Sequence, residues 1–251
     1  MVFPTLEEAL RLGEGCTFVP IALETVADMD TPVSVFKRFK DTSTHCFLLD
    51  SVEGGEKWAR YSFIGRDPLL NIRIRGRETL LESRDRHIER IEGNPFDTLR
   101  DVMARYKGAR VPGIPRLSGG AVGYFGYDMV RNVEQLPDAP EDRLGIPDGH
   151  FLVVDEMIVF DHLRQKLQII VNMRMAGDPA LNYAHAVERL RAIERTILDS
   201  GHIASGSRIR RNCHVGEVVS ETNREQYMDM VVRAKRHIVD GDIFQMVPSR
   251  R

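Results

Sequence analysis

Short segments in which hydrophobic and polar residues alternate fill much of the first half of the chain. In residues 69–75, Leu70, Ile72 and Ile74 alternate with polar residues, which predicts a strand with one buried face. Further strands are expected at residues 17–23, 45–51, 60–64, 78–83 and 86–91. The gaps between these segments are too short for a parallel crossover, so we expect antiparallel pairing.

Helices are predicted where capping residues precede apolar residues spaced three or four apart. Residues 5–12 are expected to form a short helix. A cap followed by proline predicts further helices over residues 31–40, 94–106 and 178–200. Thr222 and Glu225 fit a capping box for another helix, which Gly241 can end.

The remaining segments complete the predicted fold class. A strand is expected at residues 117–124, and residues 151–160 and 166–173 have the pattern of a hairpin. Residues 132–149, rich in Pro, Asp and Glu, indicate a surface excursion. Helices and strands are interspersed without a βαβ rhythm, which predicts an α+β fold with largely antiparallel sheets and packed helices.

Composition divides the chain into three parts. Residues 1–200 form a first domain, and residues 201–219, rich in Gly, Ser and Arg, have the character of a linker. Residues 220–251 hold the last helix and a strand at 243–247. One helix and one strand cannot bury their own apolar faces, so we expect an incomplete second domain and a chain truncated at its C-terminal end.

Composition and charge argue against several classes of function. The 251 residues are 42% hydrophobic with a net charge of -2, and the basic run at 208–211 has no aromatic residues beside it, which argues against a nucleic-acid partner. No apolar run approaches the ~18 residues of a membrane span. The N-terminus lacks the pattern of a secretion signal. Cys16, Cys46 and Cys213 are widely spaced, which favours reduced thiols in a cytoplasmic protein.

Three stretches carry the candidate chemistry. FLLDSVEGGEKWARYSFIG, residues 47–65, places Asp50, Ser51 and Arg60 around a Gly-Gly loop. A carboxylate, a hydroxyl and a cation could bind the ammonium and carboxylate of an amino acid, although a surface hairpin with solvated charges fits the same pattern. In SGGAVGYFGYDMVR, residues 118–131, the glycines match no phosphate-binding motif and favour close backbone packing. The third stretch is YMDMVVRAKRHIVDGDIFQMVPSRR, residues 227–251.

In this order, the stretches resemble the LLES…GRYSFIG, GGxxGYxxYD and GDIFQVVxSxR segments of anthranilate synthase component I. The resemblance implies an enzyme of tryptophan biosynthesis that converts chorismate and ammonia to anthranilate and pyruvate with Mg²⁺. No metal ligand is expected within this chain, because the family's magnesium-binding glutamates and chorismate-gripping residues follow the segments present here. The chain alone is therefore expected to be inactive.

The resemblance also implies a regulatory site in residues 1–200. By position, Asp50 and Ser51 fall on the acid–serine pair of the family's feedback site for L-tryptophan, and Arg60 falls near a basic position of that site. Pro20 is assigned to the same pocket, with a strand-edge proline as an equal alternative. The family's acid is usually glutamate, and the hydrogen bond that the shorter Asp50 could lose is worth about 1.5–3 kcal/mol.

Gln245 falls where relatives that add water to chorismate place a lysine. A neutral glutamine cannot deprotonate water, so it suits ammonia as the nucleophile and is expected to line the active site. A separate glutamine amidotransferase subunit would supply the ammonia, because the chain has no GxCxG-like stretch. Two alternatives remain open: aminodeoxychorismate synthase component I, which shares the fold and the pocket, and a non-catalytic tryptophan-sensing or interaction module.

Overall fold

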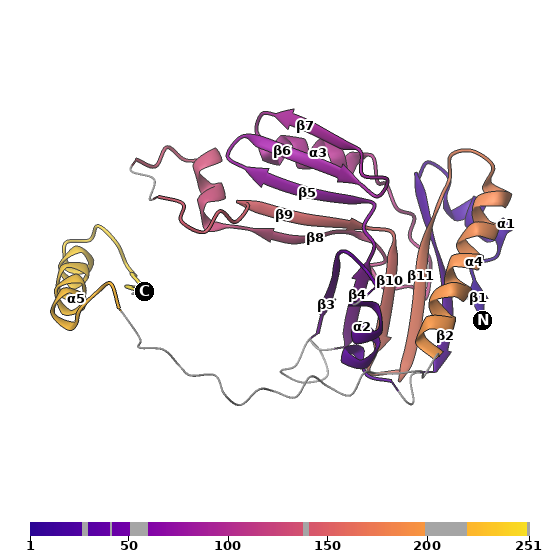
Figure 1. Ribbon diagram of the computed structural model, residues 1–251. Helices are drawn as coiled ribbons and strands as arrows, with labels where there is room; N and C mark the ends of the chain where they lie inside the picture. Colours follow the sequence, from indigo (N-terminus) through magenta and orange to yellow (C-terminus); the bar gives the residue numbers. More distant parts are fainter. Residues whose placement is uncertain (27–29, 41, 51–59, 138–140, 199–219, 250–251) are drawn as a thin grey trace. The chain divides into compact units, whose positions relative to one another are not determined.

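The computed structural model describes residues 1–26, 30–40, 42–50, 60–137, 141–198 and 220–249. The chain divides into two compact units, Met1–Ile203 and Ala204–Arg251. The predicted linker at residues 201–219 lies outside the described residues. Figure 1 shows unit 1 as two sheets with helices packed against them.

The larger sheet of unit 1, sheet A, has six strands in the order β1-β2-β11-β10-β4-β3, and every pair is antiparallel. Its strands are β1 (Val2–Phe3), β2 (Phe18–Val26), β3 (Cys46–Leu49), β4 (Tyr61–Arg66), β10 (Glu156–Asp161) and β11 (Lys166–Arg174). The central strands β10 and β11 are almost wholly buried, which explains their continuous apolar sequences. The predicted antiparallel pairing is therefore confirmed here.

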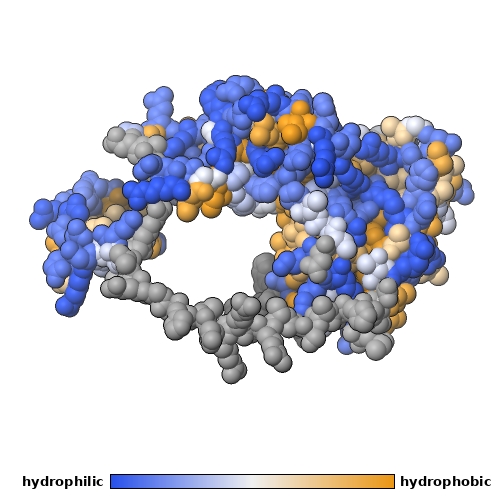
Figure 2. All heavy atoms as spheres, in the orientation of Figure 1, coloured by the Kyte–Doolittle hydropathy of each residue, from blue (hydrophilic) through white to orange (hydrophobic). Residues whose placement is uncertain are grey.

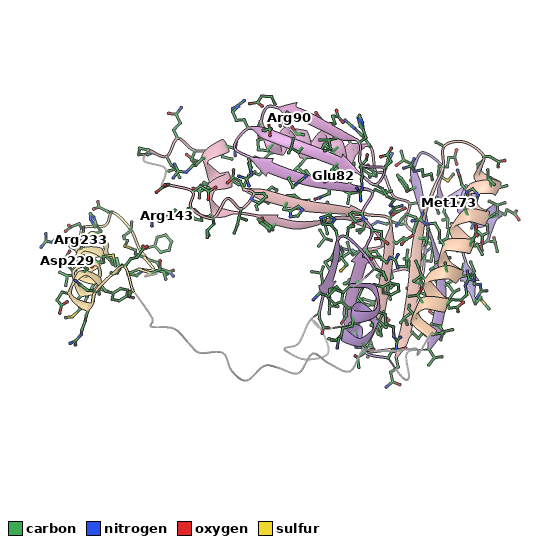
Figure 3. The ribbon with its side chains drawn as sticks, in the orientation of Figure 1. Glu82, Arg90, Arg143, Met173, Asp229 and Arg233 are labelled. Carbon is green, nitrogen blue, oxygen red and sulfur yellow. The ribbon has the colours of Figure 1, made fainter. Side chains whose placement is uncertain are left out.

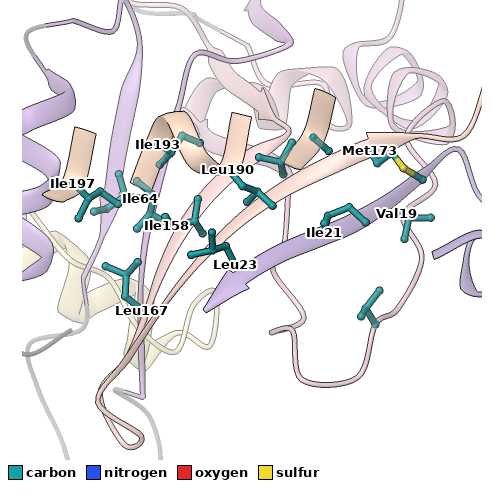
Figure 4. Close-up of a cluster of buried hydrophobic side chains, with 14 of the residues drawn as sticks. Val19, Ile21, Leu23, Ile64, Ile158, Leu167, Met173, Leu190, Ile193 and Ile197 are labelled. Carbon is teal, nitrogen blue, oxygen red and sulfur yellow. The ribbon is translucent and has the colours of Figure 1, made fainter. Parts of the chain in front are cut away.

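Helices α1 (Leu6–Leu12), α2 (Pro32–Lys40) and α4 (Pro179–Leu198) pack on sheet A. Helix α4 buries Ala186, Leu190, Ile193 and Ile197, whose spacing of three and four places them on one face. In Figure 4 the side chains of Leu190, Ile193 and Ile197 meet those of the sheet, among them Ile158. Among the described residues, this layer of helix on sheet holds the largest apolar core.

The second sheet of unit 1, sheet B, has five antiparallel strands in the order β7-β6-β5-β9-β8. Its strands are β5 (Leu70–Arg75), β6 (Glu78–Ser83), β7 (Ile88–Glu92), β8 (Gly120–Phe125) and β9 (Gly149–Val154). Helix α3 (Pro95–Ala104) covers one face, where Val102 packs with Ile72 and Val153. A short 3₁₀ helix, η1 (Tyr127–Asn132), follows β8 and buries Met129. The second sheet therefore has its own apolar core.

The prediction of a single strand over residues 151–160 is wrong in one respect. The chain forms two strands there, because it leaves one sheet and enters the other at Asp155. β9 belongs to sheet B and β10 to sheet A. Asp155 is only 4% exposed, and its carboxylate accepts hydrogen bonds from Arg84 at 2.6 Å and Arg189 at 2.8 Å. Glu156 also binds Arg189. Two arginines from distant segments thus hold the acid at the crossing, and the local apolar pattern does not reveal them.

Unit 2 contains helix α5 (Arg224–Val239) and an irregular segment after it. The capping box consists of Asn223 and Gln226, because each backbone N–H bonds the other side chain, at 2.9 and 2.8 Å. The prediction of Thr222 and Glu225 was therefore wrong by one residue. The strand predicted at residues 243–247 is not formed, since a strand needs a neighbour for its hydrogen bonds and none pairs with it among the described residues.

The surface of unit 1 facing the viewer in Figure 2 is mainly hydrophilic, with hydrophobic side chains gathered in a few patches. In the part of the chain that the structure describes, no helix combines the length and the apolar character needed to cross a membrane. Cys16 and Cys46 are free thiols. Cys213 lies outside the described residues.

Candidate functional site

The candidate site lies at one end of sheet A, where β3 ends and β4 begins. Asp50 directly follows β3 and Arg60 directly precedes β4. Ser62 and Ile64 lie on one face of β4, and Ile64 continues that face into the core beneath α4. Arg60 lies just before the strand, and its partner Asp161 pairs with Tyr61, on the other face. Ser51 and the Gly-Gly loop, residues 51–59, lie outside the described residues.

A buried hydroxyl holds the Asp50 carboxylate in place. Ser62 is fully buried, and its Oγ donates to Asp50 Oδ1 at 2.5 Å. The same oxygen lies 2.6 Å from His162 Nε2. A serine hydroxyl has a single proton, and Ser62 uses it in the hydrogen bond to Asp50. The His162 ring nitrogen must therefore donate the hydrogen bond between His162 and Ser62. The result is a relay of hydrogen bonds from His162 through Ser62 to Asp50.

A second acid holds the Arg60 guanidinium. Arg60 binds Asp161 through two bonds, Nε to Oδ1 at 3.1 Å and Nη2 to Oδ2 at 2.7 Å. The backbone N–H groups of Leu163 and Arg164 also donate to Asp161 Oδ1, each at 3.2 Å. Burial alone would raise the pKa of Asp161, but the hydrogen bonds from Arg60 and from this turn lower it overall. The hydrogen bond to Asp161 in turn raises the pKa of Arg60.

The arrangement presents a fixed anion and a fixed cation at the same end of the sheet. Asp50 is exposed, and the Arg60 side chain keeps 33% of its surface accessible. A guanidinium has five N–H donors, and the paired geometry with Asp161 leaves some of them for another acceptor. The Tyr61 ring lies beneath the guanidinium, 4.8 Å from its carbon. An anion and a cation at one end of the sheet supply the charges that a zwitterion with an ammonium and a carboxylate would need.

Pro20 does not lie with these residues. Across sheet A, Ser62 pairs with Phe160, Phe160 with Leu167, and Leu167 with Thr25. Ser62, which holds Asp50, therefore lies in line with Thr25, near the C-terminal end of β2. We call this position along the strands the Asp50 level. Pro20 pairs instead with Asn172, five positions back along β2. At about 3.3 Å per residue, this separates the two levels by roughly 16 Å along the strand. Pro20 is buried within β2.

Gln245 lies in unit 2, in the exposed segment that follows α5. Its assignment as an active-site residue stays a prediction. In the described part of the chain, no group of three or more His, Cys, Asp or Glu side chains could hold a metal ion.

Sequence reasoning missed Ser62, Asp161 and His162. Asp161 and His162 fall in residues 161–165, which the pattern marks only as a hairpin turn. Their contacts with Arg60 and Ser62 span about a hundred positions of sequence, as the separations of 101 and 100 residues show.

Comparison with known proteins adds an independent finding. Residues 44–251, which extend across both units, match the family described as chorismate binding enzyme. "Anthranilate synthase component 1" of Acetivibrio thermocellus is 45% identical over 254 residues, which cover 100% of this chain and 51% of the relative. The protein of the same name from Pseudomonas putida is 38% identical, with 98% and 50% covered. The chain thus spans about half the length of the curated relatives it matches.

A solved structure supports the fold. The crystal structure of anthranilate synthase component I from Streptococcus pneumoniae TIGR4 matches with a TM-score of 0.52 at 22% identity, covering 87% of this chain and 46% of that chain. The predicted α+β architecture with antiparallel sheets is therefore confirmed. Given the match over residues 44–251 and the identities along its full length, the chain belongs to the chorismate binding enzyme family.

Proposed function

We propose that this chain is the N-terminal half of an anthranilate synthase component I. The observation that carries the proposal is the 45% identity to a protein of that name over the whole of this chain. The complete enzyme would be a lyase of tryptophan biosynthesis in the cytoplasm. Ammonia from a glutamine amidotransferase subunit would add to chorismate, the ring hydroxyl would leave, and pyruvate would be eliminated to give anthranilate. Mg²⁺, when bound, would stabilise the charge that develops on the substrate.

The part of this function that the described residues would serve is regulation by L-tryptophan. The amino acid would place its ammonium on Asp50 and its carboxylate on the N–H groups that Arg60 keeps free. Both partners are already oriented, Asp50 by Ser62 and Arg60 by Asp161. Preorganisation of this kind reduces the ordering cost of binding, because the side chains do not have to be fixed when the ligand arrives.

Charge pairing also explains why the site would distinguish an amino acid from indole. A ligand without the ammonium and carboxylate would leave the Asp50 carboxylate without a cation, and it would gain only apolar contacts. Hydrogen bonds to charged groups contribute about 1.5–3 kcal/mol each. Loss of one such bond would therefore weaken binding by roughly tenfold or more.

The test is calorimetric titration of L-tryptophan into the folded chain. Saturable binding is expected, with a roughly tenfold or greater loss in Asp50→Ala and a similar loss in Arg60→Gln. Asp85→Ala is the matched control, because Asp85 is an exposed acid in the loop between β6 and β7, away from the site. Binding that Asp50→Ala retains in full would overturn the assignment of the regulatory site.

A second assay addresses catalysis. With chorismate, Mg²⁺ and ammonium, the chain alone is expected to form no anthranilate, because the proposed catalytic residues belong to the other half of the enzyme. Measurable anthranilate formation by the pure chain would contradict this. Formation of aminodeoxychorismate instead of anthranilate by a full-length enzyme would favour the related synthase.

A further inference from the structure

A separate cavity lies where the two sheets of unit 1 meet. It has a volume of about 190 Å³, and its walls come from the starts of β2 and β8, the crossing at Asp155, and the loops on either side of residue 113. Asn172, which pairs with Pro20, lines it. The cavity is therefore at the end of sheet A opposite the Asp50 level. We call it the junction cavity.

Four polar side chains that line the junction cavity lack an internal partner. The guanidinium groups of Arg110 and Arg116 and the hydroxyls of Tyr106 and Ser118 make no hydrogen bond or ion pair with other described residues. All four can donate a hydrogen bond, and two carry a positive charge. Arg110 and Arg116 are exposed at the rim of the cavity, and donors that line one cavity favour a ligand that accepts hydrogen bonds and carries negative charge.

The one acid in the wall of the cavity, Asp155, does not cancel this charge. Its carboxylate is already bound by Arg84 and by Arg189. The side-chain amide of Asn172, another wall residue, donates to the backbone oxygens of Ser118 and Asp155. The net character of the cavity is therefore positive and rich in donors.

An aromatic wall completes the junction cavity. The rings of Phe18 and Tyr106 stack with their centroids 5.8 Å apart and their planes 24° from parallel. Burial raises the pKa of Tyr106, so its hydroxyl stays a neutral donor. A planar ring could lie along this wall, because stacked or tilted aromatic contacts are favourable.

Two glycines allow the backbone to form the remaining wall. A Cβ on Gly119 would lie 2.6 Å from Asn172 Nδ2 and 3.0 Å from the backbone oxygen of Val154. Gly120 has φ +120°, a conformation that other residues rarely adopt, and a Cβ there would meet nothing within 4 Å. Gly119 therefore requires glycine for close packing, and Gly120 requires it for its backbone conformation.

We propose that the junction cavity binds a small carboxylate carried on a planar ring. The carboxylate would accept hydrogen bonds from Arg110 and Arg116, with the hydroxyls of Tyr106 and Ser118 beside them. The ring would lie against Phe18 and Tyr106. This site is separate from the proposed L-tryptophan site, because it uses none of the same residues and lies at the other end of sheet A.

The test uses benzoate as the probe, titrated into the full 251-residue chain and followed by backbone amide NMR shifts. Saturable shifts are expected at residues around the cavity. An Arg110→Gln, Arg116→Gln double variant should weaken binding by about tenfold or more, and Tyr106→Phe by less. An Arg77→Gln, Arg100→Gln double variant is the matched control with the same charge change on exposed residues outside the cavity, and its affinity should be unchanged.

Benzamide and inorganic phosphate separate the two parts of the proposal. Benzamide has the ring without the charge and should bind much more weakly than benzoate. Phosphate that binds as tightly as benzoate would overturn the role of the ring, and benzoate binding that survives the cavity variant would overturn the site. Asp50→Ala should still bind benzoate, so failure of the L-tryptophan site and failure of this one can be told apart.

Discussion

Helices α4 and α5 are both marked in the sequence by capping residues and a periodic apolar pattern, yet they differ in what their apolar faces contact. α4 lies on sheet A and buries four apolar side chains. α5 buries only Ala234, while Val232 and Val239 are exposed, the latter at 84%. The comparison shows that local signals suffice to specify a helix, whereas a tertiary partner decides whether its apolar face contributes to a core.

The polar contacts of the two helices differ in the same way. Arg189 on α4 binds the buried Asp155 and Glu156 at the crossing between the sheets. Arg233 on α5 binds Asp229 one turn away at 3.0 Å, and both side chains are largely exposed. Figure 3 labels the two residues on this helix. The pair on α5 is local, and the pair on α4 connects elements that are distant in sequence. We expect mutations to separate the two cases clearly.

The largest difference should come from the apolar faces. Leu190→Ala removes a fully buried side chain and leaves a cavity in the core, so we expect a loss of about 2–5 kcal/mol in the free energy of unfolding. Val232→Ala on α5 should change it by less than about 0.5 kcal/mol, because the side chain is already exposed. Urea unfolding followed by circular dichroism measures both. Equal losses would mean that α5 has a buried partner after all.

The ion pairs should give the next largest difference. Arg189→Met leaves the buried Asp155 with one arginine instead of two, and the free energy of unfolding should fall by about 1–3 kcal/mol. Arg233→Met breaks an exposed pair within one helix, for which a loss of about 0.3–0.5 kcal/mol is expected. The same urea experiment compares them. A negligible effect of Arg189→Met would show that the ion pair with Arg84 alone is enough to stabilise the buried Asp155 carboxylate.

These contrasts also explain how much of the fold could be predicted from sequence. The alternation of Leu70, Ile72 and Ile74 predicted β5 to within one residue, because a strand with one buried face leaves a period of two. The crossing at Asp155 leaves no such period. It depends on Arg84 and Arg189, about 71 and 34 residues away, and only the folded chain brings them together. Local patterns therefore predicted the elements and missed the point where they change sheets.

The candidate site divides in the same way. The resemblance assigned Asp50 and Arg60, and the structure shows what orients each of them. Ser62 and His162 could not be found from local pattern, since their contact joins segments 100 residues apart. Pro20 was assigned by its place at a strand, and the register places it at the level of Asn172 instead. Motifs thus identify charged groups, while strand pairing determines which of them meet.

The capping box of α5 allows a test of how much local hydrogen bonds stabilise this helix. Asn223→Ala removes the side-chain acceptor for the Gln226 N–H and should destabilise the helix by about 1 kcal/mol. Thr222→Ala is the control, because Thr222 lies outside the observed box. Amide hydrogen exchange along α5 would report the change. If the two variants exchange at equal rates, neither Asn223 nor Thr222 acts as the cap of α5.

The smallest effect should appear as a pH dependence within unit 1. Burial lowers the pKa of His150 below its usual 6.5, and His45 and Arg73 lower it further. The unfolded chain therefore binds this proton at a higher pH than the folded chain does, so stability falls as the pH decreases from about 6.5 toward the lowered pKa. Below that pKa the loss is complete.

His150→Gln removes the titrating group from the hydrogen bond that His150 Nε2 makes with Asn71 Oδ1 at 2.6 Å, while its amide can still donate to Asn71. The free energy of unfolding, measured between pH 5 and pH 7, should therefore depend less on pH in this variant than in the wild type. His185→Gln, on the α4 surface, controls for loss of a histidine elsewhere in unit 1. If the free energy of unfolding of His150→Gln depends on pH as steeply as that of the wild type, the pH dependence arises from another group. The contrast between buried and exposed polar contacts would then not extend to His150.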